Sequence, residues 1–180
     1  MKAFFIAAGV LLSTQSIGQK YFSKSTRISF YSKAPLENIS AVNKTAACII
    51  DTQTGLIQCS VLIKSFEFPK ALMQEHFNEN YLESDKYPKS EFKGSIVNNG
   101  EINYEKPGTY TAKIKGQLTI HGVTREIETT GSIIIGAGVD IACDFIIKLS
   151  DYNISIPALV KDNISNNVKV SISSRMEPLK

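Results

Sequence analysis

The sequence has no tryptophan, and its 180 residues include only three cysteines and two histidines. So few sulfur and nitrogen ligands, at scattered positions, do not predict a zinc site, which takes about four ligands. Lysine and arginine number 20 against 17 acidic residues, which gives a formal net charge of +3. A basic excess this small and dispersed does not predict a nucleic-acid partner.

Motifs that carry catalysis are also missing. The chain has no G-x-S-x-G nucleophile motif, no glycine-rich loop leading into a helix, and no carboxylate pair placed for acid–base work. His76 stands in the stretch Gln-Glu-His-Phe-Asn-Glu, but no second histidine follows four positions later. We therefore expect a protein that is not an enzyme and that has no cofactor and no metal.

Long apolar runs are confined to the N-terminus. The run Ala3–Leu12 follows a lysine and precedes small residues, which is typical of a secretory signal peptide. We expect residues 1–18 to be this signal peptide and residues 19–180 to form one domain, periplasmic or secreted. The run is too short to cross a bilayer, so no membrane span is expected.

Most of the remaining chain alternates between apolar and polar residues, clearest at 110–120 and 127–135. Period-two alternation predicts strands with one apolar face. We expect a four-residue link at 121–124 between these two strands. With this link, Leu118 would pair with Ile127 across the hairpin, and Ala112 would pair with Ile133.

Similar alternation upstream and downstream gives about eight strands joined by short turns. Long strands in hairpin succession favour a meandering antiparallel barrel over a sandwich of short strands. Pro69–Tyr81 differs, because Met73, Phe77 and Tyr81 recur at helical spacing. We predict an amphipathic helix there that packs on the barrel or closes one end.

Two of the cysteines flank a predicted turn. If Asp51 pairs with Leu56, Cys48 lies directly opposite Cys59, close enough for a cross-strand disulfide. Two buried free thiols fit the pattern equally well. Cys143 lies on an apolar face and is predicted to be a buried thiol.

The predicted inward face of the three long strands carries no charge. If it lines a cavity, the ligand must be mostly hydrocarbon, because polar groups would be left unpaired. Gly116 and Gly131 remove volume from the middle of this face, either to let the strands bend or to leave room. A barrel of about eight strands can be filled by side chains or can hold one small ligand, and the sequence favours neither.

Two motifs resemble those of a known family. The stretch from Leu72 to Gly94, with a helix followed by Tyr87-Pro88, and the stretch Leu118-Thr-Ile-His-Gly-Val-Thr124 are similar to the YceI-like family of lipid- and polyisoprenoid-binding proteins. The segment Asp151–Pro157 fits its later part. The resemblance implies an extended lipocalin-like antiparallel barrel, usually exported, with an isoprenoid or fatty chain in an apolar tunnel.

We therefore expect a carrier or sequestering protein for a long-chain apolar ligand, working as a monomer or homodimer. A barrel that binds no ligand and acts through protein contacts is the alternative, followed by a lipid hydrolase. His76 and Tyr81 could touch a polar head group, or simply pack. The candidate ligand-binding residues are Phe30, Ile63, Leu72, Met73, His76, Phe77, Tyr81, Phe92, Tyr110, Ile114, Gly116, Leu118, Gly131, Ile133, Phe145 and Ile147.

Overall fold

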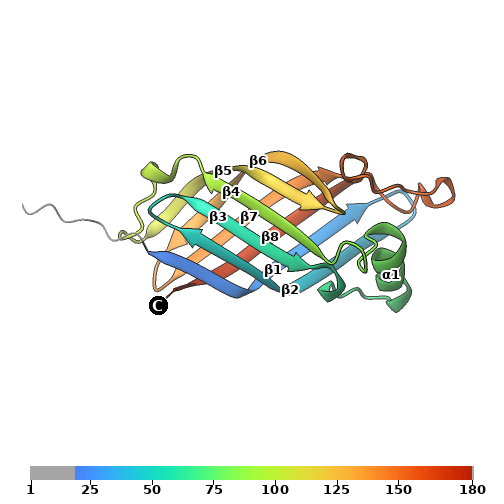
Figure 1. Cartoon of the computed structure of the whole chain (residues 1–180), viewed down its shortest axis with the longest axis horizontal. Helices are drawn as coiled ribbons and strands as arrows, with labels where there is room; N and C mark the ends of the chain where they lie inside the picture. Colours follow the sequence, from blue (N-terminus) through green and yellow to red (C-terminus); the bar gives the residue numbers. More distant parts are fainter. Residues whose placement is uncertain (1–18, 180) are drawn as a thin grey trace, which may run out of the picture.

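The computed structural model describes residues 19–179, and the predicted signal peptide, residues 1–18, lies outside them. The described chain forms a closed barrel in which every strand pairs antiparallel with its neighbours in sequence and the last strand returns to the first (Figure 1). This confirms the predicted barrel. The strands are β1 Lys20–Lys33, β2 Asn38–Asp51, β3 Leu56–Leu62, β4 Lys89–Ile96, β5 Gly108–Ile120, β6 Val123–Ile135, β7 Val139–Lys148 and β8 Asn167–Pro178.

The turn between β5 and β6 is tighter than expected. His121 and Gly122 alone connect the strands, and both have positive φ angles, 50° and 73°. Two central residues with positive φ are what a type I′ hairpin requires. The observed register pairs Leu118 with Arg125 and Ala112 with Gly131. The expected register was therefore wrong by two residues, a slip that leaves each side chain on its predicted face.

The predicted helix is shorter than Pro69–Tyr81. α1 spans Ala71–His76 and then widens into a π-helical turn, η2, at Phe77–Tyr81. Pro69 and Lys70 form a bend before it, and Lys70 has extended backbone, so the helix begins only at Ala71. The other short helical turns are η1 Ile63–Ser65, η3 Asn99–Glu101, η4 Leu149–Tyr152 and η5 Ala158–Val160.

The two ends of the barrel differ in how they are filled. α1, η4 and η5 lie at one end, which we call the helix end, and the opposite end carries the β2–β3 turn and the β4–β5 connection (Figure 1). At this opposite end, the closed end, buried side chains fill the interior. They are Cys48, Ile50, Ile57, Ile96, Ile102, Ala112, Ile133, Ile135, Val139 and Met176.

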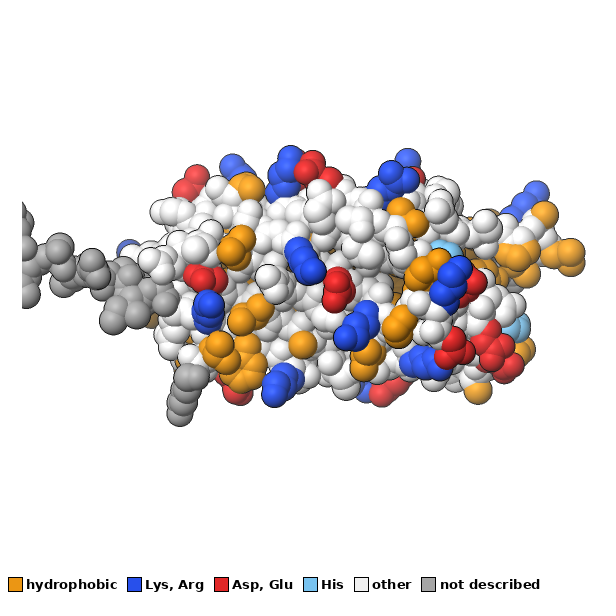
Figure 2. Space-filling view, viewed as in Figure 1, with side chains coloured by type: hydrophobic (Ala, Val, Ile, Leu, Met, Phe, Trp, Pro, Cys, Tyr) orange, Lys and Arg blue, Asp and Glu red, His pale blue; other side chains and the backbone are white. Residues whose placement is uncertain are grey.

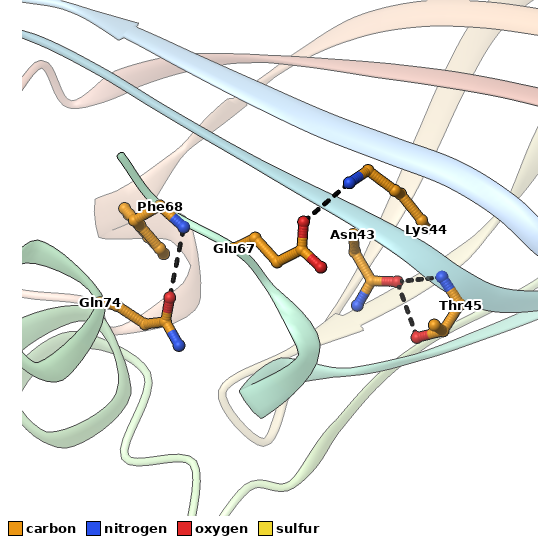
Figure 3. Close-up of polar contacts among 6 residues, drawn as sticks. All are labelled: Asn43, Lys44, Thr45, Glu67, Phe68 and Gln74. Carbon is orange, nitrogen blue, oxygen red and sulfur yellow. Dashed lines mark hydrogen bonds and ion pairs between the residues drawn. The ribbon is translucent and has the colours of Figure 1, made fainter. Parts of the chain in front are cut away.

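A polar network fixes the segment that leads into α1. Glu67 forms a backbone bridge with Val42 of β2, and its carboxylate accepts a hydrogen bond from Lys44 Nζ at 2.8 Å (Figure 3). The Gln74 side chain reaches back to the Phe68 backbone N–H at 3.3 Å. The segment before α1 is thus held against β2, and the Gln74 side chain ties the helix to that segment.

A disulfide joins Cys48 to Cys59 across the β2–β3 hairpin. The two residues are direct partners in the ladder, two pairs beyond Ile50 and Ile57, as the turn spacing predicted. Cys143 is a free, half-buried thiol on β7. Its sulfur lies 3.8 Å from Thr129 Oγ1, and burial raises the pKa of the thiol. Cys143 is therefore held mainly as the neutral thiol, the less nucleophilic form.

Removing the disulfide is expected to lower the free energy of unfolding by about 2–3 kcal/mol, because the cross-link limits the entropy of the unfolded chain. Chemical denaturation of the double variant Cys48→Ala/Cys59→Ala measures this loss. A Cys143→Ala variant serves as the control, since it should keep the difference in stability between oxidised and reducing buffer. If the wild-type protein were equally stable in oxidising and in reducing buffer, the cross-link would contribute nothing to its stability.

Tyr104, in the β4–β5 connection, packs against the closed-end core and donates a hydrogen bond to Asn99 Oδ1 at 2.8 Å. Burial raises the pKa of this phenol to about 12. The folded protein therefore keeps the proton at pH values where the unfolded chain, with a tyrosine pKa of about 10, has lost it. Stability from this group is complete below pH 10 and is lost as pH rises toward about 12.

We expect this loss to be about 2 kcal/mol, somewhat less than the shift alone would give, because the ring is only partly buried. Unfolding free energies measured from pH 9 to pH 12, in wild type and in Tyr104→Phe, test it. The variant should lose its hydrogen bond at every pH but fall less steeply than wild type above about pH 10. If the unfolding free energies of wild type and Tyr104→Phe fell in parallel from pH 9 to pH 12, the raised pKa of Tyr104 would be refuted.

Candidate ligand-binding site

A cavity of about 390 Å³ occupies the helix end of the barrel. Its wall is made of the inward faces of the strands, α1 with η2, and the connection between β7 and β8. Figure 2 shows hydrophobic side chains gathered at this end of the molecule. The cavity wall includes these residues from the sequence-based candidates: Phe30, Ile63, Met73, His76, Phe77, Tyr81, Phe92, Ile114, Leu118, Phe145 and Ile147.

Burial along single strands marks where the interior is hollow. On β6, the inward residues Ile133 and Ile135 near the closed end are buried, whereas Ile127 and Thr129 near the helix end are only half-buried. On β7, every second residue from Ile141 to Ile147 faces inward and is half-buried, and so is Leu149 at the start of η4. Inward apolar residues stay partly accessible because the cavity leaves their surfaces uncovered. The barrel is thus filled in one half and hollow in the other.

Protein atoms already occupy the space beside the two central glycines, Gly116 and Gly131. Gly94 and Gly116 are cross-strand partners, and a Cβ on Gly116 would lie 2.5 Å from Gly94 Cα and 2.7 Å from Phe92 Cζ. The Phe92 ring therefore lies against the glycine pair. A Cβ on Gly131 would meet the Ala142 carbonyl at 2.7 Å. Both glycines therefore permit close approach of protein atoms, and neither is among the residues that line the cavity.

Three other candidates also lie elsewhere. Leu72 is on the outer side of α1 and is 61% exposed, because the helix turns Met73 and Phe77 inward instead. Tyr110 packs against the closed-end core, where its hydroxyl donates to the Lys106 carbonyl at 3.0 Å. Ile133 belongs to the same core and borders only a small cavity of about 40 Å³. These three residues therefore do not line the main cavity.

An aromatic cluster that we did not predict forms the wall beneath α1. Phe66 and Phe68 pack with Phe30 and Phe77, and the ring centroids of neighbouring pairs lie 5.0–5.7 Å apart. Phe66 and Phe68 lie two residues apart in the segment between η1 and α1, and this spacing could have identified them. The cluster joins β1, the pre-helix segment and η2 into one apolar surface.

The β7–β8 connection supplies further apolar wall. It has no regular period, so only the structure reveals which of its residues face inward, namely Ile154, Val160 and Ile164. Inward residues of the strands also line the cavity. We recognised the alternation of Ile28, Val168, Val170 and Ile172 but did not select these residues, and Ile39 was not part of a recognised alternation.

Polar groups gather at the mouth of the cavity. Glu37, in the β1–β2 turn, accepts a hydrogen bond at 2.8 Å from Nζ of Lys70, the residue that precedes α1. This hydrogen bond, with a further one from Asn163, lowers the pKa of Glu37. The three residues come from three different connections and meet where the cavity opens. His76 and Tyr81 also border the cavity, and burial raises the pKa of Tyr81, which keeps its phenol neutral.

His121 ties the segment after α1 to the β5–β6 turn. Its Nε2 lies 2.6 Å from a carboxylate oxygen of Glu83, and its Nδ1 lies 3.2 Å from the Tyr152 carbonyl oxygen. The ring also packs against Tyr87, with 4.6 Å between centroids. His121 therefore connects three segments around the helix end and does not face the cavity.

Within residues 19–179, no group of three or more histidine, cysteine, aspartate or glutamate side chains is placed to hold a metal ion. In the same residues, no helix is long and apolar enough to cross a membrane. The chemistry that the site offers is thus apolar contact inside and hydrogen bonding at its mouth.

A closed antiparallel barrel with an apolar internal cavity defines the class of small β-barrels that can enclose a hydrophobic molecule. Residues 20–176 match the YceI-like domain, and the chain belongs to that family. No curated protein matches the chain.

Several solved structures share the fold. A polyisoprenoid-binding domain from Saccharophagus degradans has a TM-score of 0.76 at 16% identity, over 90% of this chain and 99% of its own. BcnA from Burkholderia cenocepacia has a TM-score of 0.70 at 17% identity, and the match covers 84% of this chain and 96% of BcnA. The YceI protein of Campylobacter jejuni has a TM-score of 0.56 at 18% identity, and the match covers 100% of this chain and 99% of that protein.

Proposed function

We propose that the protein is an exported carrier or sequestering protein that holds one long-chain apolar molecule, such as a polyisoprenoid or a fatty chain. The observation that carries the proposal is the cavity at the helix end, about 390 Å³ in volume and lined almost wholly by apolar side chains. Its volume lies within the range of small-molecule pockets, about 300–1,000 Å³. Export rests on the apolar run Ala3–Leu12.

Burial of hydrocarbon alone can supply the binding free energy. Covering ~500 Å² of apolar ligand surface is worth about 12 kcal/mol at ~25 cal/mol per Å². Ordering a flexible chain and losing its free motion takes back a large part of this gain. A polar ligand would lose its hydrogen bonds to water and find few partners on the wall. The wall therefore selects for hydrocarbon and against sugars and ions.

The comparison with the Saccharophagus degradans structure supports this ligand class, because that protein is described as a polyisoprenoid-binding domain. At 16% identity the likeness extends to the fold, so the ligand assignment for this chain depends on its own cavity. The polar mouth formed by Glu37, Lys70 and Asn163 supports an amphiphilic ligand whose head remains near water.

The two alternatives predict other interiors. A barrel acting only through protein contacts needs no cavity, yet the helix end is hollow. A hydrolase needs a nucleophile beside a base. The nucleophile Cys143 borders the cavity, but its sulfur contacts the Thr129 hydroxyl and burial raises the pKa of its thiol. We therefore propose binding without chemical conversion.

Titration of the delipidated protein with cis-parinaric acid, a fluorescent fatty acid, tests the proposal. Because the chain has no tryptophan, the ligand signal is free of indole emission. We expect saturable binding of a single equivalent, displaced by farnesol or palmitate but not by glucose. A signal that does not saturate, or that glucose displaces equally well, would contradict an apolar binding site.

A further inference from the structure

The cavity has a floor, and the floor is made of a few identifiable side chains. The main cavity and the small cavity of about 40 Å³ behind it share part of their walls. Residues that line both must lie between them. They are Ile57, Ile114, Ile141, Cys143 and Ile172, and we call them the floor.

Beyond the floor the barrel is blocked. The closed-end core fills the space behind the small cavity, and Ile102 from the β4–β5 connection is buried in that core. Tyr104 packs against it and is held by its hydrogen bond to Asn99. A chain that enters at the helix end therefore cannot pass through the molecule and must stop at the floor.

The strands give the depth of this blind pocket. From the floor residue Ile141 to Leu149, the inward residue at which the wall from β7 passes into η4, is eight residues along the chain. At about 3.3 Å per residue, and with a strand tilt of about 40°, this corresponds to about 20 Å along the barrel axis. An extended chain advances about 3.5 Å for every three backbone bonds, so about 17 bonds fit along this stretch of wall above the floor.

We propose that the floor sets the length of the ligand, and that an apolar chain of about 17 bonds, roughly four isoprene units, is the longest that this protein buries completely. The inference rests on the proposed function and specifies its ligand. Longer chains gain nothing from their added carbons, because these remain in water outside the mouth.

A series of straight-chain fatty acids tests the length limit in the wild-type protein. Displacement of cis-parinaric acid by laurate, palmitate, arachidate and lignocerate gives four dissociation constants. We expect at least about tenfold tighter binding from laurate to palmitate and no more than about twofold from arachidate to lignocerate, since each buried CH₂ is worth up to about fourfold. Affinity that keeps rising to lignocerate would overturn the floor while leaving the proposed function intact. If no chain binds, the proposed function itself fails.

A variant of a floor residue tests whether the floor sets the length limit. Ile141→Ala removes atoms between the two cavities, so we expect lignocerate to bind at least about threefold tighter relative to palmitate than in wild type. Ile146→Ala is the matched control on the same strand, because Ile146 points outward and is 69% exposed. Ile141→Val provides a milder opening if the alanine variant does not fold. An unchanged ratio in a folded Ile141 variant would overturn the role of the floor.

Discussion

Replacing Ile114 with arginine is expected to abolish ligand retention while the barrel stays folded. Ile114 faces inward from β5, lines the main cavity and belongs to its floor. An arginine there keeps its charge at every working pH and finds an apolar wall around it. A hydrocarbon chain would then have to share the cavity with an unpaired charge or with the water that the charge retains. We expect palmitate to bind at least about 100-fold more weakly, or about 2.7 kcal/mol.

The matched control for this variant is Thr111→Arg. Thr111 lies on the same strand but points outward and is exposed, so an added arginine there contacts solvent. Circular dichroism should show the same strand content in both variants. Retention of palmitate by a folded Ile114→Arg protein would contradict the position of the ligand. Loss of binding in Thr111→Arg would show that the effect does not depend on facing.

Replacing Gly116 with alanine is expected to destabilise the whole barrel. The added Cβ would lie 2.5 Å from both Gly94 Cα and the Lys93 carbonyl oxygen, and 2.7 Å from Phe92 Cζ. Two of these atoms are backbone atoms of the paired strand, so they cannot move without separating the ladder. Overpacking typically costs about 1–3 kcal/mol, and we expect a loss of about 3 kcal/mol because the opposing atoms are rigid. Urea denaturation measures the change.

Gly100→Ala is the control for the glycine variant. A Cβ at Gly100 would meet no heavy atom within 4 Å, so the substitution should change the free energy of unfolding by less than about 0.5 kcal/mol. If Gly116→Ala and Gly100→Ala had the same stability, the close approach of β4 and β5 at the glycine pair would be refuted.

Strand facing could be predicted because it depends only on period two. The β5–β6 register was wrong by two residues, yet Ile114 and Leu118 still face inward, since an even slip preserves the face. The error came from the turn. His121 adopts a positive φ, a conformation that non-glycine residues adopt only uncommonly, so the sequence did not signal a two-residue connection.

The division of the barrel into a filled half and a hollow half could not be predicted. It depends on side chains from irregular segments, namely Ile102 and Tyr104 at the closed end and Ile154, Val160 and Ile164 at the helix end. Such segments have no period that reveals which residues turn inward. The role of Gly116 likewise could not be decided from the sequence, because only the paired strands show that Phe92 occupies the space beside it.

Mass spectrometry of organic extracts from protein purified out of its native host tests the central claim most directly. The blind apolar pocket predicts an extracted prenyl or acyl compound in near-equimolar amount, with a main chain of about 17 bonds or slightly more. The folded Ile114→Arg variant, purified in parallel, should yield little of it. Wild-type protein that carries no such compound, and does not take one up from a lipid extract of its host, would contradict the account.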